Sequence, residues 1–478
     1  MLTAFLTPKR AFAAVAFFIG EMSEGMNYFQ AIYLVGIGWN ESAVGLCISI
    51  MGFTTLFMQG ITGDFIDRTH HDRRLLLLIA TFATAFSACA ILLVREGNQD
   101  HGLMYSTKVI EGVAISFLTP CLASLILSNF GPEQFDSVVA NNLIAGLSGY
   151  AVSAVSVGTA AYFLYPNIKY CFLLIGISAL FAAFFIQFLP RGDHLMGRGF
   201  QQRVKYEEEI TVTPNVKSQP PILINDENTH LFEKQLEPTA SAYWTVLSER
   251  RTLVFCLTGF FFHFANANVL LVLGELFSQG NNGNDTEASK RAAIPFMAAA
   301  TLISQAFMCL SVATGKNLTQ RGVGRKVILL SAIATLPLRI ALILIWRNAG
   351  TRILLLTQIF DGIEGGFFRV IHPYIVVDVT FGTGRFNLIM GLTNSFFWLG
   401  RTFSTLLGQF VVEKYGHVAS LMCSMVISLM PVSLFGIFME ETMNTRLSKE
   451  ESTDGQRDDV SLKKMRHVDS DDHYVKVC

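Results

Sequence analysis

The residues Gly63-Asp64-Phe65-Ile66-Asp67-Arg68-Thr69-His70-His71-Asp72-Arg73-Arg74 connect two apolar stretches at about 43–62 and 75–95. Each stretch has about 20 residues, the length that an α-helix needs to cross a hydrocarbon core of roughly 30 Å. A short charged loop between two such stretches is typical of a helical hairpin that crosses a membrane twice. This segment therefore predicts an integral membrane protein.

Apolar stretches of this length recur along the whole chain. Hydrophobic residues make up 51% of the 478 residues and charged residues only 15%, a composition typical of a chain that faces lipid. The stretches lie near 11–37, 43–62, 75–95, 103–128, 138–163, 168–189, 252–277, 292–314, 327–347, 352–379, 387–412 and 418–439. We therefore expect an all-α membrane protein of about twelve transmembrane helices. The first stretch carries Glu21 and Glu24 and is too long for a signal peptide, so we expect it to remain as the first helix.

The basic residues between the stretches predict which side each loop faces. They fall on one side if every stretch crosses, at Lys9, Arg10, Arg68, Arg73, Arg74, Lys316, Arg321, Arg325 and Lys326. Because loops rich in lysine and arginine face the cytoplasm, both termini are expected there, and the plasma membrane is the expected location. On the opposite face, Asn284-Asp285-Thr286 is a glycosylation sequon, which predicts a glycan on Asn284.

Two polar segments divide the chain. Residues 190–251 include five prolines and show neither a heptad nor a strand alternation, which predicts a cytoplasmic linker. Residues 440–478 are rich in charged residues and serine, which predicts a disordered cytoplasmic tail. The expected order is a cytoplasmic N-terminus at 1–10, a six-helix half at 11–189, the linker, a second six-helix half at 252–439, and the tail.

The two halves contain matching short motifs. Ile110-Glu111-Gly112 in the fourth helix matches Phe360-Asp361-Gly362 in the tenth. Phe130-Gly131 followed by Phe135-Asp136 matches Phe381-Gly382 followed by Phe386-Asn387, and both offsets are near 250 residues. A parallel repeat of two six-helix halves, related by an axis along the membrane normal, places a solute site between the halves. Chance similarity of short glycine and phenylalanine patterns is the alternative explanation.

The loop at Gly63 resembles the signature loop of the major facilitator superfamily. A degenerate second copy follows the eighth helix, with Gly315 and Arg325 kept and Thr319 where the acid would stand. The resemblance implies two pseudo-symmetric halves that rock around a central site, with acid-to-arginine contacts in these loops that break during rocking. Asp67 and Arg68 are the first candidates for such a pair, with Asp64 as a second acid. The full set of gate candidates is Gly63, Asp64, Asp67, Arg68, Gly315, Arg321 and Arg325. The alternative is that these charges only fix the orientation in the membrane.

Ionisable residues inside the apolar stretches need a partner, a water-filled cavity or a function, because a charge at the bilayer centre is costly. In the first helix, Glu21, Glu24 and Tyr28 share one face, and Asn27 lies beside it. Two carboxyl groups one turn apart repel each other when both are ionised, which favours protonation of one. We therefore predict proton coupling through Glu24 first, with Glu21 as its neighbour. A pair held by hydrogen bonds or by an arginine, without titration during transport, is the alternative.

The tenth helix carries a polar stripe of Asp361, Glu364, Arg369 and His372. Its two acids are further candidates for proton coupling. Arg339 is expected to be the buried partner of an acid, whereas two roles remain open for Arg401: counter-ion, or anchor for a carboxylate or phosphate. The substrate-binding candidates are Tyr28, Asn27, His263, Asn266, Arg369, His372 and Arg401.

These observations favour a proton-coupled secondary transporter of a small organic solute, with export by antiport of a drug or metabolite against protons as the preferred direction. The segment from Asp361 to Asn387 resembles a bacterial branch of the superfamily whose substrates are poorly defined. Uptake of an anionic nutrient by proton symport is the alternative, and a membrane sensor or scaffold on the same fold is the alternative from another class.

No nucleotide-binding loop, nucleophile motif or paired metal spacing of the eight cysteines is present in the sequence, so we expect neither an enzyme nor a metal site. The expected driving force is a proton gradient, with no cofactor. The expected partners are lipid and a small-molecule substrate; the net charge of −1 argues against nucleic acid, and a monomer is expected.

Overall fold

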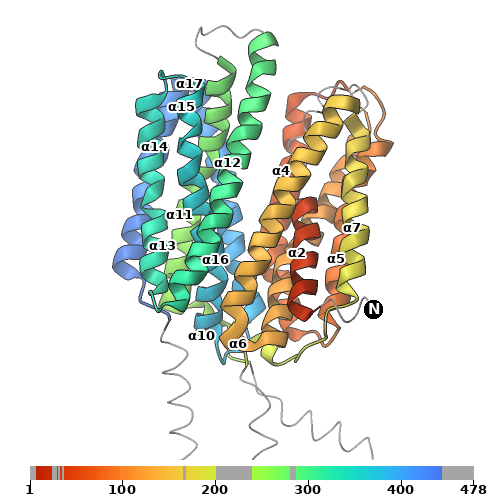
Figure 1. Ribbon diagram of the computed structural model, residues 1–478, viewed down its shortest axis with the longest axis vertical. Coiled ribbons are helices and arrows are strands. Elements are labelled where there is room, and N and C mark those ends of the chain that lie inside the picture. Colours follow the sequence, from red (N-terminus) through yellow and green to blue (C-terminus); the bar gives the residue numbers. More distant parts are fainter. Residues whose placement is uncertain are drawn as a thin grey trace, which may run out of the picture.

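The computed structural model describes residues 7–23, 30, 33–34, 37–97, 99–164, 168–200, 240–279 and 287–443. All regular elements in these ranges are helices, and they form two bundles that stand side by side (Figure 1). The predictions for Glu24, Asn27, Tyr28 and Asn284, and for most of the linker and tail, fall outside the described residues.

The first bundle is formed by the N-terminal half of the chain. Its elements are α2 (Pro8–Ser23), α4 (Glu41–Arg68), α5 (Arg73–Cys89), η1 (Ala90–Leu93), α6 (His101–Leu164), η2 (Ile168–Phe172) and α7 (Leu173–Ile186), followed by the short turn η3 (Met196–Arg198). Helix α6 contains 64 residues, which at 1.5 Å per residue would extend about 95 Å, far beyond a hydrocarbon core of roughly 30 Å. The chain turns at Gly131, whose φ of 67° and ψ of 172° interrupt the helix, so α6 supplies two crossings.

The second bundle repeats this arrangement. Its elements are α10 (Tyr243–Leu247), α11 (Arg250–Gln279), α12 (Glu287–Gln320), α13 (Arg325–Ile333), α14 (Thr335–Trp346), α15 (Thr351–Leu355), α16 (Thr357–Thr380) and α17 (Phe386–Phe438). Helix α17 contains 53 residues and is interrupted at Gly416, whose φ is 82°. It therefore also supplies two crossings.

Seven helical stretches in the described part of the chain are long and apolar enough to span a membrane. Two of them contain the breaks just described and count as two crossings each. Helix α2 has only 16 described residues, and α16 carries charges in its middle. When α2, α12 and α16 are added, the described helices give twelve crossings, which confirms the all-α fold class predicted from the sequence.

The surface and the interior of each bundle differ as expected for a protein in lipid. Phe57, Ile79, Leu180 and Val426, from four different helices, are each more than half exposed. Their apolar side chains point outward because lipid, not water, surrounds the bundles. Inside, small residues allow helices to approach closely. A Cβ atom at Gly149 of α6 would lie 2.0 Å from the carbonyl oxygen of Phe17 in α2, so glycine is required at this crossing.

The two bundles pack against each other where α4 meets α17 and where α12 meets α6. The loops that follow α4, α7, α12 and α16 lie at one end of the molecule, together with residues 187–200 and 240–249 that border the linker (Figure 1). We call this the linker end.

Substitution of Gly149 by alanine is predicted to lower the free energy of unfolding by about 1–3 kcal/mol, because the backbone of α2 must move away from the added methyl group. Gly52→Ala is the matched control, since nothing lies within 4 Å of a Cβ atom built at Gly52. Thermal unfolding in detergent should show a lower midpoint for Gly149→Ala and an equal or higher one for Gly52→Ala. Equal midpoints for both variants would contradict the tight packing of α2 on α6.

Candidate functional site

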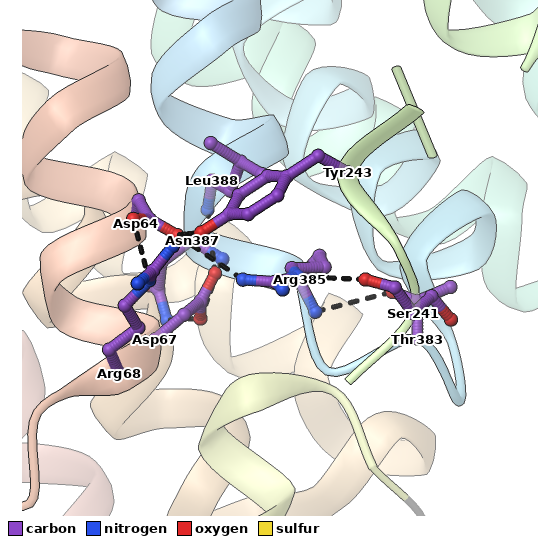
Figure 2. A network of polar contacts seen from close by, with 9 residues as sticks. All are labelled: Asp64, Asp67, Arg68, Ser241, Tyr243, Thr383, Arg385, Asn387 and Leu388. Atoms are coloured by element: carbon purple, nitrogen blue, oxygen red, sulfur yellow. Dashed lines mark hydrogen bonds and ion pairs between the residues drawn. The ribbon is translucent and has the colours of Figure 1, made fainter. Parts of the chain in front are cut away.

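The carboxylate of Asp67 joins the two halves at the linker end. It stands at the end of α4, is fully buried, and accepts hydrogen bonds from the backbone N–H of Leu388 at 2.8 Å, the backbone N–H of Asn387 at 3.2 Å and the Asn387 side-chain amide at 2.8 Å (Figure 2). These N–H groups belong to the first turn of α17, which has no side-chain cap of its own. The first N–H groups of a helix lack partners within it and carry partial positive charge. Asp67 therefore caps a helix of the opposite half.

A glycine permits this contact. A Cβ atom at Gly63, one turn before Asp67, would lie 2.2 Å from the carbonyl oxygen of Asn387. Further along the same crossing, a Cβ atom at Gly391 would lie 2.1 Å from the carbonyl oxygen of Gln59. Each of these close approaches between the backbones of α4 and α17 thus depends on a glycine in one of the two helices.

Asp64, one residue after Gly63, links three segments of the chain. Its carboxylate pairs with Arg68 of the same helix at 2.8 Å and with Arg385 of the other half at 3.2 Å, and it accepts a hydrogen bond from the Tyr243 hydroxyl at 2.6 Å (Figure 2). The sequence offered Asp67 as the first acid and Asp64 as the second acid for this loop, and in the structure Arg68 pairs with Asp64. The reason is geometric, because residues i and i+4 of a helix share a face and consecutive residues do not.

The second copy of the loop makes a different contact between the halves. The Arg325 guanidinium, at the start of α13, lies 2.8 Å from Asp136 of α6 and 2.6 Å from Asp378 of α16. The Tyr374 hydroxyl donates to the backbone oxygen of Asp136 at 2.5 Å. Arg325 and Asp378 are almost completely buried. We call the Asp67, Asp64 and Arg325 contacts together the interlock.

The other residues predicted for this second loop lie outside the Arg325 contacts. Arg321 is exposed and forms no ion pair with another described residue. Gly315 packs against Val370 and Phe367 of its own bundle, where a Cβ atom would be 2.9 Å from the valine side chain. Thr319, which replaces the acid, donates to the Gly315 carbonyl oxygen at 2.9 Å within α12.

The segment that follows α7 supports the interlock from the first half. Arg73 donates to the backbone oxygen of His194 at 3.0 Å, and His194 Nε2 lies 2.7 Å from the carbonyl oxygen of Thr69. A carbonyl only accepts, so Nε2 carries the hydrogen. Burial lowers the pKa of His194, and the positive charges of Arg73 and Arg198 lower it further, so the ring is neutral near pH 7.

Away from the linker end, α4 and α17 separate. An apolar groove of about 600 Å³ opens between them, lined by residues that include Phe53, Leu56, Phe57, Leu392, Leu399 and Phe403. One polar contact crosses it, from the Ser395 hydroxyl to the Leu56 carbonyl oxygen at 2.9 Å. The two halves are therefore held together most firmly at the linker end.

A buried cluster of charges lies inside the second bundle. Arg339 of α14 is fully buried and lies 2.7 Å from Asp361 and 2.9 Å from Glu364, both on α16. It also donates to the Asn266 side-chain oxygen of α11 at 2.7 Å, and Ser304 of α12 donates to Asp361 at 2.5 Å. The structure confirms Arg339 as a buried partner of acids. It also brings two of the predicted proton-coupling candidates onto the same guanidinium.

The first bundle contains a simpler pair. Lys108 and Glu111 of α6 are buried and lie 2.8 Å apart, and the Ser87 hydroxyl donates to Glu111 at 2.9 Å. Among the described residues, one cation faces one anion here. Glu21 of α2 is half-buried and accepts a hydrogen bond from the Ser178 hydroxyl at 2.7 Å.

The remaining predicted side chains gather among aromatic rings of the second bundle. The His263 ring lies 5.4 Å from Phe368 and 5.2 Å from Phe397, and the His372 ring lies 4.9 Å from Phe397. His372 Nε2 is also 2.7 Å from the Thr393 hydroxyl. Arg369 lies three residues before His372 on α16, and Arg401 lies four residues after Phe397 on α17. Two guanidiniums, an imidazole and aromatic faces therefore share one region of the second bundle.

Sequence reasoning missed several residues of the interlock, namely Tyr243, Arg385, Asn387, Asp136 and Asp378. The motif repeat contained a signal for two of them, since Asp136 and Asn387 occupy matching positions after a glycine and a phenylalanine. No group of His, Cys, Asp or Glu suited to hold a metal ion occurs among the described residues.

Two six-crossing bundles, joined by polar contacts at one end, define a transporter built from two opposed helical halves. A family model of the Major Facilitator Superfamily matches residues 11–321. The chain belongs to the major facilitator superfamily, and it is a secondary transporter and not an enzyme.

Similar proteins agree with this assignment. The chain is 25% identical over 441 residues to an uncharacterised MFS-type transporter of Mycobacterium tuberculosis in strains CDC 1551 and H37Rv. The aligned residues cover 91% of this chain and 94% of the relative. The human organic anion transporter MFSD10 (TETRAN) has a TM-score of 0.59 at 14% identity, covering 90% of this chain and 100% of that chain. The proton:xylose symporter XylE bound to 6-bromo-6-deoxy-D-glucose has a TM-score of 0.64 at 14% identity, covering 92% of this chain and 98% of that chain. The two structures support the fold alone.

Asp67→Asn is predicted to weaken the interlock, because a neutral amide replaces the charged acceptor at the N-terminus of α17. The loss should be about 1.5–3 kcal/mol, or roughly 10- to 150-fold in the ratio of separated to joined halves. Spin labels at the exposed residues Gln134 and Gln320, one at the linker end of each half, would report the separation by double electron–electron resonance.

Asp72→Asn is the matched control for this experiment. Asp72 also caps a helix, accepting from the backbone N–H of Arg74 at 2.9 Å, but both residues belong to the first half. A distance distribution that changes equally in both variants would show that the effect is not specific to the contact between the halves.

Proposed function

We propose that this transporter moves a small organic solute by alternating access and couples the movement to protons. The linker end would face the cytoplasm, as the basic loops predict, and the interlock would be the cytoplasmic gate. Export of the solute against inward proton flow is the preferred direction. A plasma-membrane location, a glycan at Asn284 and a role for Glu24 stay predictions from the sequence.

The proposed proton coupling is supported by the number of charged groups around Arg339. One buried guanidinium lies within 3 Å of two carboxyl groups, Asp361 and Glu364. A cation can balance one carboxylate, and a second ionised carboxylate in a membrane interior costs several kcal/mol. The cluster therefore favours one bound proton.

The two acids differ in access. The Glu364 side chain is fully buried, and its Oε2 has no hydrogen-bond partner among the described residues. The Asp361 side chain is 21% exposed. A proton could therefore enter at Asp361 and be held by the pair, and water reaching the cluster in the other conformation would favour its release.

Glu364→Gln is predicted to abolish proton-driven accumulation of solute, because glutamine keeps the size of the side chain but cannot gain or lose a proton. Exchange of solute across the membrane without net proton movement should persist. The measurement uses proteoliposomes with an internal pH dye and a panel of organic anions, cations and neutral solutes.

Glu413→Gln, at an exposed carboxylate, serves as the control and should behave as wild type. Full proton-coupled transport by a folded Glu364→Gln protein would remove this cluster from the mechanism. Silence of the wild type across the whole panel would instead favour a sensor or scaffold.

Uptake of an organic anion by proton symport is a second candidate function, favoured by the basic and aromatic region of the second bundle. Arg369, Arg401 and His263 supply groups that bind a carboxylate or phosphate, and Phe368 and Phe397 supply apolar surface for an organic body. This region lies on α11, α16 and α17, and α16 also carries the proton cluster.

Arg401→Gln is predicted to raise the KM for anionic solutes about tenfold or more and to leave neutral and cationic solutes unaffected, since a charge-assisted hydrogen bond contributes about 1.5–3 kcal/mol. Arg352→Gln, at an exposed arginine of α15, is the control. The assay is solute-dependent proton flux, with its direction recorded. Unchanged anion kinetics in Arg401→Gln would argue against an anion site here.

A further inference from the structure

The end of the linker passes through the interlock. Residues 240–249 precede α11, and their backbone is fastened to the loop between α16 and α17. The Ser241 N–H donates to the Thr383 carbonyl oxygen at 2.9 Å, and Arg385 Nε donates to the Ser241 carbonyl oxygen at 3.2 Å (Figure 2). The buried side chain of Val246 anchors the following turn, α10. This segment is thus attached to the second half.

Tyr243, the first residue of α10, reaches from this segment to the first half. Its hydroxyl donates to Asp64 at 2.6 Å. Its ring lies 4.1 Å from the Arg385 guanidinium carbon and 5.3 Å from that of Arg68. One tyrosine therefore contacts an acid and an arginine of the first half and an arginine of the second half, as the close view shows (Figure 2).

The ring and hydroxyl of Tyr243 lie beside two positive charges, those of Arg68 and Arg385. Arg68 and Arg385 both pair with the single carboxylate of Asp64. Two guanidiniums around one carboxylate leave an excess positive charge, and an aromatic ring stabilises nearby cations through its negative face. The tyrosine hydroxyl also gives the carboxylate a neutral donor that adds no charge. Tyr243 therefore lowers the cost of bringing the two arginines together.

We propose that Tyr243 is a positioning residue of the gate. Residues 240–249 then form a third component of the interlock beside the two helical halves. This inference rests on the proposed role of the interlock as the cytoplasmic gate. Because the segment is fastened to the second half, separation of the halves requires the Tyr243 contacts with Asp64 and Arg68 to break. The position of residues 240–249 then biases the equilibrium between joined and separated halves.

The test compares Tyr243→Phe and Tyr243→Ala in the full chain, with spin labels at Gln134 and Gln320. Phenylalanine removes only the hydroxyl contact and should raise the ratio of separated to joined halves about 5- to 20-fold. Alanine also removes the ring and should raise the ratio further, to roughly 10- to 100-fold. Trp244→Ala is the matched control, since Trp244 is the neighbouring aromatic residue, is 79% exposed, and should leave the ratio unchanged.

A double-mutant cycle separates a specific contact from a general loss of structure. In an Asp64→Asn background, Tyr243→Phe should have a much smaller effect, because the hydroxyl then donates to a neutral acceptor. Full additivity of the two substitutions would overturn the proposed contact.

Asp67→Asn in the same assay separates failure of this proposal from failure of the gate. If Asp67→Asn separates the halves and Tyr243→Ala does not, the role of Tyr243 is refuted and the gate stands. If neither variant changes the distances, the interlock is not a gate, and the proposal for Tyr243 falls with it.

Discussion

The capping of α17 by the buried carboxylate of Asp67 is the contact on which the arrangement of the two halves depends. It places a buried carboxyl group against three N–H groups of the opposite half, where the helix itself offers no acceptor. Gly63 must lack a side chain for this to occur, and Ser124 and the backbone of Gly197 complete the surroundings of Asn387. A carboxylate that is held by N–H groups alone can be released to water when the helices part, because water replaces each donor. Such a contact is strong in one conformation without being permanent.

At the two signature loops, matching positions of the two halves carry different types of residue. The signature loops align with an offset of 252 residues, so that Asp67 corresponds to Thr319 and Arg73 to Arg325, while Asp136 of α6 corresponds to Asn387 of α17 with an offset of 251. At the first loop, the acid, Asp67, lies at the end of α4, and the amide, Asn387, lies on the opposite half. In the second loop the acid lies on the opposite half and the loop supplies an arginine. The loss of the acid at Thr319 is therefore offset by the acid at Asp136, and both crossings keep a charged contact.

Much of the fold could be predicted because hydropathy and chain length dictate it. The expected helix ends agree with the described ones within a few residues for most crossings, and the buried role of Arg339 followed from the cost of a charge in lipid. The partners could not be predicted, because Asp67 and Asn387 are 320 residues apart and no local pattern specifies that contact. The pairing of Arg68 with Asp64 could have been foreseen from helix periodicity. Tyr243 was missed because the linker was interpreted as unstructured, whereas its last residues, 240–249, are held by contacts with the interlock.

Helix α16 carries residues of both the proposed proton site and the interlock. Asp361 and Glu364 lie near its beginning, and Asp378, which holds Arg325, lies 17 residues after Asp361, about 25 Å along the axis. A change in the charge of the cluster alters how firmly the beginning of α16 is bound to Arg339 on α14. In the proposed mechanism, a tilt of α16 would carry this change to Asp378 and thereby to the contact of Arg325 with Asp136 in the other half. Pro373, between the two sites, removes one backbone hydrogen bond and gives the helix a place to bend. The proposed coupling of protons to the gate thus has a physical path through a single helix.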